Sequence, residues 1–220
     1  MSISVFVVRH GQTMFNLYHR MQGWSDSPLT ESGIQDAVRA GKDLAHQHFD
    51  YVFTSDLRRA VDTAKWIMKQ HDPDNQPAIT QDPHFREVNL GFMEGEPGDS
   101  MGNFLSGKWH HYHSWAEFME DYSMAQARDI MHEKDPYHLA ESDDQFISRI
   151  KRGIERLRQL PDGSKVLLVD HGLVVRSLME LYASRDVYDG TEAPKNAHIS
   201  LMKLDGDQTT VEYFNRVNLP

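Results

Sequence analysis

Short apolar runs and longer amphipathic segments alternate along the chain. Runs rich in β-branched and aromatic residues predict buried strands at 5–9, 51–54, 78–80 and 165–170, and two closing strands at 199–204 and 210–214. Apolar residues at helical spacing predict helices at 30–47, 57–68, 141–160 and 173–183. This alternation predicts an α/β fold, a three-layer α/β/α sandwich with a mostly parallel central sheet.

Two of the predicted helices are preceded by residues that commonly cap helix N-termini. Thr30 stands directly before the first of them, where an N-cap is expected. The pair Ser55-Asp56 precedes the helix over 57–68, so we expect it to cap that helix.

The region from about 97 to 140 departs from the alternating pattern. Its composition shifts towards Met, His, Trp and Tyr, and its apolar residues show weak periodicity. We therefore expect helical pieces that form a lid-like insertion in a single domain spanning 1–220. The aromatic residues expected to pack within this insertion are Trp109, Tyr112, Trp115, Phe118 and Tyr122.

Composition narrows the classes of protein that fit. The chain has 220 residues, of which 39% are hydrophobic, enough for one domain with a sizeable core. It contains no Cys, which excludes disulfides, a thiol nucleophile and thiolate-bound metals. The net charge of -10 argues against binding to nucleic acid or to an anionic membrane. No secretory signal pattern or membrane-length apolar run is present, so a cytoplasmic location is expected.

Two predicted strands end in the same polar motif. The first ends in Arg9-His10-Gly11, and the strand over 165–170 is followed by His171-Gly172. Ligands of open α/β sheets bind beyond the carboxyl ends of the strands. If the two strands are neighbours, both imidazoles lie at one edge of the sheet, which favours a functional site over two unrelated structural histidines.

Together with later motifs, these strand ends resemble the histidine phosphatase superfamily, which shares its fold with cofactor-dependent phosphoglycerate mutase. The matching motifs stand in the family's order: Arg9-His10-Gly11-Gln12-Thr13, Gln22-Gly23-Trp24, Thr54-Ser55-Asp56-Leu57-Arg58-Arg59-Ala60, Arg86-Glu87 and His171-Gly172. Each motif alone is weak, but the ordered set is specific. It leaves 99–139 uncovered, and the resemblance implies that this insertion lies over the active site.

The resemblance also implies a role for each matching residue. His10 is expected to be the nucleophile that accepts a phosphoryl group, and Glu87 the proton donor. Three side chains are expected to hold the phosphate oxygens: Arg9, Arg59 and His171. The expected substrate-binding positions are Asn16, Gln22, Gly23 and Gly172.

General chemistry supports such a mechanism. An imidazole attacks phosphorus through an unprotonated nitrogen, so a backbone carbonyl or a carboxylate is expected to hold its other N–H. A carboxyl group with a raised pKa protonates the leaving alkoxide and then activates water, which gives ping-pong hydrolysis. Preorganised cations stabilise the transferring group, so no metal and no cofactor are expected. A cluster that could suggest a metal is instead expected to serve a surface or lid role: His110, His111 and His113.

Several neighbouring residues have competing interpretations. Arg58 is expected to be a solvated surface charge, because Arg59 matches the family position directly before Ala60. Glu94 is expected to orient its loop and not to act as the acid. Asp170 either favours the charged form of His171 or points away from it. Asn196 lies in a late loop, and the sequence only weakly indicates that it belongs to the site.

Three functions fit these motifs. We expect a phosphomonoester hydrolase, because the insertion has few cations and many aromatic and acidic residues, which suits a less anionic or partly apolar phosphoester. A cofactor-dependent phosphoglycerate mutase is the first alternative. A non-catalytic phosphoester-binding protein is the second, since fold alone does not establish activity. The expected partner is a small phosphorylated metabolite, and a homodimer is possible.

Overall fold

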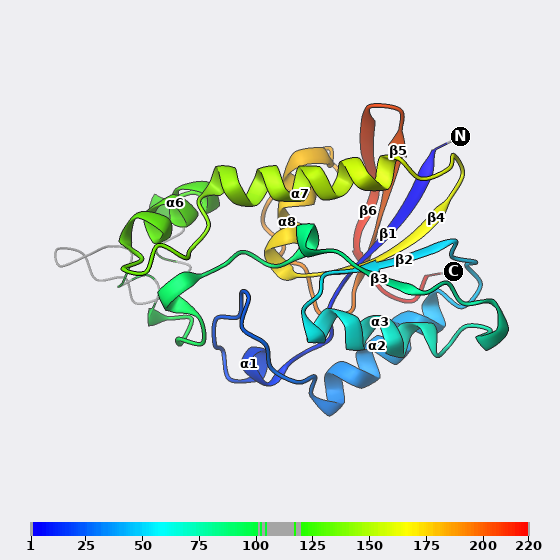
Figure 1. Cartoon of the computed structure of the whole chain (residues 1–220), viewed down its shortest axis with the longest axis horizontal. Helices are drawn as coiled ribbons and strands as arrows, with labels where there is room; N and C mark the ends of the chain where they lie inside the picture. Colours follow the sequence, from blue (N-terminus) through cyan, green and yellow to red (C-terminus); the bar gives the residue numbers. More distant parts are fainter. Residues whose placement is uncertain (1, 101, 103, 105–116, 118–119, 220) are drawn as a thin grey trace.

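One six-stranded sheet forms the centre of the protein (Figure 1). The computed structural model describes residues 2–100, 102, 104, 117 and 120–219. Across the sheet, the strands are β3 (Ile79–Gln81), β2 (Tyr51–Thr54), β4 (Lys165–Asp170), β1 (Ile3–Arg9), β5 (Ile199–Asp205) and β6 (Gln208–Arg216). Neighbouring strands from β3 to β1 are parallel, whereas β5 is antiparallel to both β1 and β6. The sheet is therefore mostly parallel, as predicted.

Helices cover both faces of this sheet, which confirms the predicted three-layer α/β/α sandwich (Figure 1). On one face lie α2 (Glu31–Asp43) and α3 (Arg58–Met68), and on the other lie α7 (Asp143–Arg158) and α8 (Gly172–Tyr182). Further helical segments are α1 (Met14–Leu17), α6 (Met124–Lys134) and the short 3-10 turns η1 (Pro73–Asn75), η2 (Pro83–Phe85) and η3 (Gly91–Met93). In the described part of the chain, each helix is too short or too polar to cross a membrane.

Strand β1 shows how the sequence builds a core on each side of the sheet. Val5 and Val7 pack with apolar residues of α7 and α8, whereas Phe6 and Val8 pack with those of α2 and α3. Side chains alternate between the two faces of a strand, so a strand covered on both faces needs a continuous apolar run. Burying each of these side chains contributes about 1.5–3 kcal/mol relative to leaving it exposed. Strand β1 is thereby fixed in the middle of the molecule.

The N-cap predicted for α2 is confirmed. The Thr30 side chain accepts a hydrogen bond from the Gly33 amide at 3.0 Å. The helix ends at Asp43, before the predicted end at Gln47, and the chain turns away at Leu44.

The cap predicted for α3 is wrong. The N-cap residue is Leu57, whose side chain makes no capping hydrogen bond. The Arg58 amide instead donates to the Asp26 carboxylate at 2.5 Å. Ser55 and Asp56 bond to residues that are distant in sequence: Ser55 contacts His171, and Asp56 pairs with Arg86. These contacts involve residues at the carboxyl edge of the sheet, and local sequence spacing does not reveal them.

The segment predicted as a lid-like insertion contains α6 in its described part. Ser123 begins this helix with a capping box, in which Gln126 bonds back to the Ser123 amide. Tyr122 packs against the core that α7 and α8 share. The other residues singled out in this region lie outside the described residues: Trp109, His110, His111, Tyr112, His113, Trp115 and Phe118.

Candidate active site

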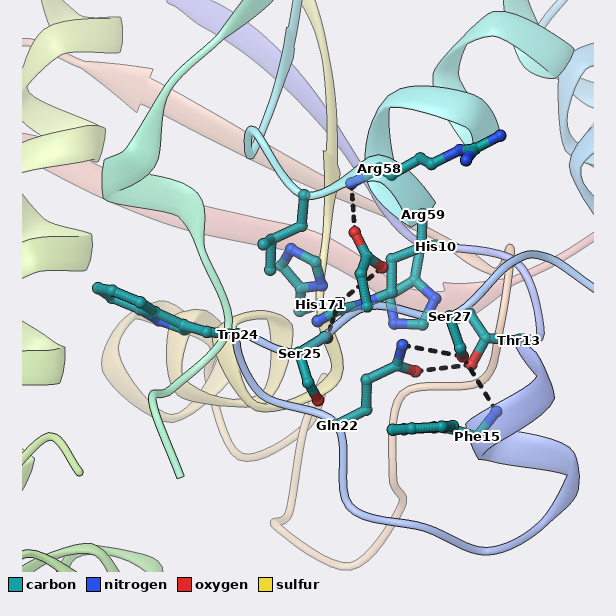
Figure 2. Close-up of polar contacts among 12 residues, drawn as sticks. His10, Thr13, Phe15, Gln22, Trp24, Ser25, Ser27, Arg58, Arg59 and His171 are labelled. Atoms are coloured by element: carbon teal, nitrogen blue, oxygen red, sulfur yellow. Dashed lines mark hydrogen bonds and ion pairs between the residues drawn. The ribbon is translucent and has the colours of Figure 1, made fainter. Parts of the chain in front are cut away.

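The pairing of β1 with β4 brings the two predicted histidines together. Arg9 pairs with Asp170 in register, and the His10 amide donates to the Asp170 carbonyl at 2.8 Å. His10 and His171 therefore leave the sheet side by side, with ring centroids 5.3 Å apart (Figure 2). Asn196 joins them, since its side-chain amide donates to the His10 carbonyl at 2.8 Å.

The backbone sets the state of the His10 ring. Its Nδ1 lies 2.8 Å from the Gly11 carbonyl, which accepts only if Nδ1 carries the hydrogen. The lone pair is then on Nε2. Burial, together with the charges of Arg59 and Arg9, lowers the pKa of His10 well below 6.5. The ring is therefore neutral at neutral pH, as a nitrogen nucleophile must be.

The two adjacent arginines at the start of α3 point in different directions (Figure 2). The Arg59 side chain is fully buried, and it donates to the carbonyls of Gly23 at 2.7 Å and Ser25 at 2.9 Å. It also pairs with Asp26 at 3.2 Å. The Arg58 side chain is 81% exposed, so the expectation that Arg58 is a surface charge is confirmed.

Arg9 is the second arginine of the site. Its Nη1 donates to the Pro194 carbonyl at 2.7 Å, which ties the site to the late loop that carries Asn196. Its Nε is buried without a protein partner in the described part of the chain. A side chain at Gly172 would place its Cβ 3.3 Å from this Nε, so the glycine leaves room for the guanidinium.

His171 has a partner that the sequence analysis did not assign. Its Nε2 lies 2.6 Å from Ser55 Oγ, and both residues are fully buried. Its Nδ1 is buried without a partner among the described residues. Burial, followed by the charges of Arg59, His10 and Arg9, lowers the pKa of His171 well below 6.5. A phosphate dianion beside the ring would oppose that shift.

Asp170 does not act on the His171 ring as an ion-pair partner. Its Oδ1 accepts from the His171 backbone amide at 2.8 Å, and its Oδ2 is buried without a partner in the described residues. Burial raises the pKa of Asp170 well above 3.8, so the carboxyl resists ionisation. Neither Asp170 oxygen bonds to the His171 ring, so the structure favours the alternative in which Asp170 does not act on that ring.

Replacing Asp170 with Asn is expected to flatten the dependence of stability on pH. A folded-state pKa above the unfolded value stabilises the protein at low pH, and this stability is lost as pH rises towards the folded pKa. The loss in the natural protein is about 1.4 kcal/mol per pH unit over that interval. The substituted amide side chain keeps an oxygen for the His171 amide but does not ionise. Urea unfolding between pH 4 and 8 measures both slopes, and equal slopes would contradict the assignment.

Glu87 is held by two backbone amides. Its carboxylate oxygens accept from Val88 at 3.0 Å and from Leu173, at the start of α8, at 2.9 Å. Burial raises its pKa above 4.5, although the two amides and the arginines oppose the shift. A buried carboxyl with a raised pKa can hold a proton and release it to a leaving group.

Two side chains hold the Glu87 segment in place, and one of them, Arg149, lies outside the family motifs. Arg149 of α7 donates to the Glu87 carbonyl at 3.1 Å and forms an ion pair with Glu141 at 2.7 Å. The indole N–H of Trp24 donates to the same carbonyl at 2.8 Å. An amphipathic helix pattern marks Arg149 as one polar position among many, so sequence reasoning had no signal for this contact.

Glu94 holds its own loop, as expected, because it accepts from the Leu90 amide at 3.1 Å, and it also holds the loop after α1. Its carboxylate accepts from the amides of Gly23 at 3.1 Å, Trp24 at 2.7 Å and Ser25 at 2.9 Å. Arg59 donates to carbonyls of the same loop. The loop is therefore held through its amides by Glu94 and through its carbonyls by Arg59. Charge-assisted hydrogen bonds of this kind are the strong ones.

The predicted substrate-binding positions divide into two groups. Asn16, Gln22 and Gly172 line the cavity described below. The Gln22 amide is oriented by Thr13 at 2.6 Å and by Ser27 (Figure 2). Gly23 instead packs against the segment that follows Glu87, where a Cβ would collide with the Val88 carbonyl oxygen.

A cavity of about 690 Å³ opens directly beside His10. Its reaction end contains Arg9, His10 and Glu87, while Arg59 and His171 form the buried layer behind them. Within the described residues, no three His, Asp or Glu side chains converge as metal ligands would. The arrangement places a neutral imidazole, cations and a carboxyl of raised pKa around one cavity, which can bind and transfer an oxyanion.

Comparison with known proteins gives the same family as the sequence motifs. The chain matches the histidine phosphatase superfamily (branch 1) over residues 5–217. A probable phosphoglycerate mutase, GpmB of Yersinia pseudotuberculosis serotype O:1b, is 33% identical over 177 residues, which are 80% of this chain and 73% of that protein. A phosphoglycerate mutase structure from Bacillus anthracis is 30% identical, with a TM-score of 0.86 over 97% of this chain and 93% of that chain. Bacillus stearothermophilus YhfR is 27% identical, with a TM-score of 0.77 over 98% of both chains. The chain therefore belongs to the histidine phosphatase superfamily.

Proposed function

We propose that the protein is a phosphomonoester hydrolase that forms a phosphohistidine on His10. The state of the His10 ring carries this proposal. The Gly11 carbonyl takes the Nδ1 hydrogen, and the Nε2 lone pair is left beside a cavity that also contains Arg9 and Glu87. A neutral imidazole next to a cation is suited to attack on a bound phosphate.

The reaction then proceeds in two displacements. In the first, the His10 Nε2 lone pair forms a bond to phosphorus, the ester P–O bond breaks, and Glu87 gives its proton to the leaving alkoxide. In the second, the Glu87 carboxylate takes a proton from water, the oxygen of that water bonds to phosphorus, and the P–N bond breaks. Inorganic phosphate leaves, and both residues return to their starting state.

Charge stabilisation in both steps falls to the cations around His10. Negative charge spreads over the equatorial oxygens of the transferring group. The positions of Arg9 and Arg59 bring fixed positive charge to this region. Burial lowers the pKa of both guanidinium groups, and the nearby Glu87 carboxylate opposes that shift. Preorganised charges in a buried site stabilise such a transition state without reorganising during the reaction.

A phosphoglycerate mutase is the competing function, and the names of two relatives favour it. A mutase must hold a substrate with further anionic groups beyond the transferred phosphate. Two of the cations farther along the cavity are paired with carboxylates, Arg128 with Asp143 at 2.5 Å and Arg176 with Glu180 at 2.9 Å, while Arg20 donates to the Gly95 carbonyl. The hydrolase is therefore the better supported assignment. Retention of a nucleophile, a carboxyl and two arginines supports either enzyme over a non-catalytic binding protein.

Two assays run in parallel test the proposal. One measures phosphate release from a panel of phosphomonoesters, and the other measures isomerisation of 3-phosphoglycerate primed with 2,3-bisphosphoglycerate. We expect phosphate release to dominate and to persist in a chelator. Isomerisation that is faster than release would overturn the hydrolase assignment in favour of the mutase. Arg59→Ala should lower phosphate release, whereas its matched control Arg58→Ala should not, since the Arg58 side chain is exposed and that of Arg59 is buried.

A further inference from the structure

The cavity beside His10 continues into a wall that the proposed chemistry does not use. Beyond the reaction end, six residues form an apolar surface: Met21, Leu90, Met124, Ala127, Met131 and Leu173. At a volume of about 690 Å³, the cavity is much larger than a phosphate group requires and lies within the usual range for whole ligands. The part of the substrate that leaves as an alcohol must occupy this space.

Helix α6 contributes one continuous side of this wall. Met124, Ala127 and Met131 recur at intervals of three and four residues, so they share one face of the helix. All three are buried, with at most 8% of each residue exposed. This face is therefore turned into the molecule, with part of it lining the cavity. The polar side chains that line the cavity near its mouth, including those of His19, Arg20 and Asp99, are exposed.

The polar groups in this part of the cavity already have partners. The Arg128 guanidinium is 4% exposed and bonds to Asp143, and Arg176 bonds to Glu180 and to the Gly190 carbonyl. A polyhydroxylated alcohol would bring several hydroxyl groups against methionine and leucine side chains. Burying hydroxyl groups without hydrogen-bond partners is costly. An apolar alcohol avoids that cost and gains from leaving water.

Resting on the proposed hydrolase function, we propose that the substrate is the phosphate monoester of an apolar alcohol, with an aryl or medium-length alkyl group seated against α6. Three methionines suit groups of varied shape, because their flexible thioether chains adapt to what they contact. Selectivity among substrates is therefore expected to depend on the apolar area of the alcohol and not on its exact shape. Arg9 and His10 bind the phosphate, while Met124 and Met131 determine the preference for the alcohol.

A homologous series of substrates tests this assignment. Methyl, butyl and hexyl phosphate carry the same charge and similar leaving groups, so their kcat/KM values report contact with the alcohol. We expect kcat/KM to rise about three- to fourfold per added methylene, and hexyl phosphate to exceed glycerol 3-phosphate. Met124→Gln and Met131→Gln should reduce the ratio of hexyl to methyl phosphate. Met14→Gln, in α1 and outside the cavity lining, should leave that ratio unchanged.

The outcomes separate this inference from the function on which it rests. Unchanged turnover of methyl phosphate shows that a methionine variant is folded. Equal kcat/KM for methyl and hexyl phosphate, with turnover still dependent on His10, would overturn the apolar substrate and leave the hydrolase intact. If kcat/KM still rises steeply from methyl to hexyl phosphate in both methionine variants, α6 is not the surface that binds the alcohol. Failure to release phosphate from any ester or to phosphorylate His10 would overturn the hydrolase and the inference together.

Discussion

Replacing His10 by Ala is expected to abolish phosphate release and covalent phosphorylation of the protein together. The Nε2 lone pair forms the new bond to phosphorus in the proposed first step, and Ala offers no nucleophile in its place. Loss of a nucleophile typically lowers kcat on the order of 10⁴–10⁶-fold. Quenched single-turnover reactions with a radiolabelled ester measure both effects, because a phosphoryl group on histidine is stable in alkali and lost in acid.

His46→Ala provides the control for this experiment. His46 is exposed in the turn after α2, near the amino end of β4, where Gln47 bonds to Lys165. The site lies at the opposite, carboxyl end of that strand, so turnover in this variant should equal that of the natural protein. Because His10 is only 3% exposed, thermal unfolding must show that His10→Ala is folded. A folded His10→Ala protein that still forms an alkali-stable phosphoryl adduct would place the nucleophile elsewhere.

Replacing Glu87 by Gln is expected to lower kcat for alkyl phosphates by about 10²–10⁴-fold. Gln keeps one oxygen to accept from the Val88 or the Leu173 amide, but it supplies no proton to the leaving alkoxide. An ester with a stable leaving group, such as 4-nitrophenyl phosphate, needs no such proton, so its first step should slow far less. A burst of nitrophenol followed by slow release of phosphate would identify hydrolysis of the phosphohistidine as the rate-limiting step of the variant.

The pH profile gives an independent measure of Glu87. Burial lowers the pKa of His10 below 6.5 and raises that of Glu87 above 4.5. Loss of a proton from His10 increases kcat/KM as pH rises, and loss of the proton from Glu87 decreases it. Gln does not ionise, so the decrease should disappear in Glu87→Gln. The exposed Glu155 is the control, and Glu155→Gln should retain both the increase and the decrease of kcat/KM with pH. An unchanged decrease in Glu87→Gln would mean that another group is the acid.

Those parts of the fold that rest on local patterns could be predicted from the sequence. Val5 to Val8 are buried on both faces of the sheet, and that burial requires the apolar run that predicts β1. Thr30 caps α2 through an amide three residues away, which is a local contact. The positions of His10 and His171 followed from the strand ends, because neighbouring parallel strands end at one edge.

Contacts between distant segments could not be predicted in this way. Ser55 matches the composition of a helix cap, but its hydroxyl contacts His171, which is 116 positions away. Arg149 looks like one polar position on an amphipathic helix, yet it supports the Glu87 carbonyl. Three-dimensional arrangement determines both contacts, and neither leaves a periodic signal. The same holds for Asp170, whose buried carboxyl is separated from solvent by elements from several parts of the chain.

The position of β1 also has a consequence for how the protein is made. This strand lies between β4 and β5, which begin at Lys165 and Ile199, so it emerges from the ribosome well before either partner. At about 5–20 residues per second, its partners follow roughly 8–40 s later. An unpaired apolar strand is a template for aggregation during that interval. Soluble yield in cells is therefore expected to depend on chaperones that shield the nascent β1, and activity should arise only after β5 has been synthesised.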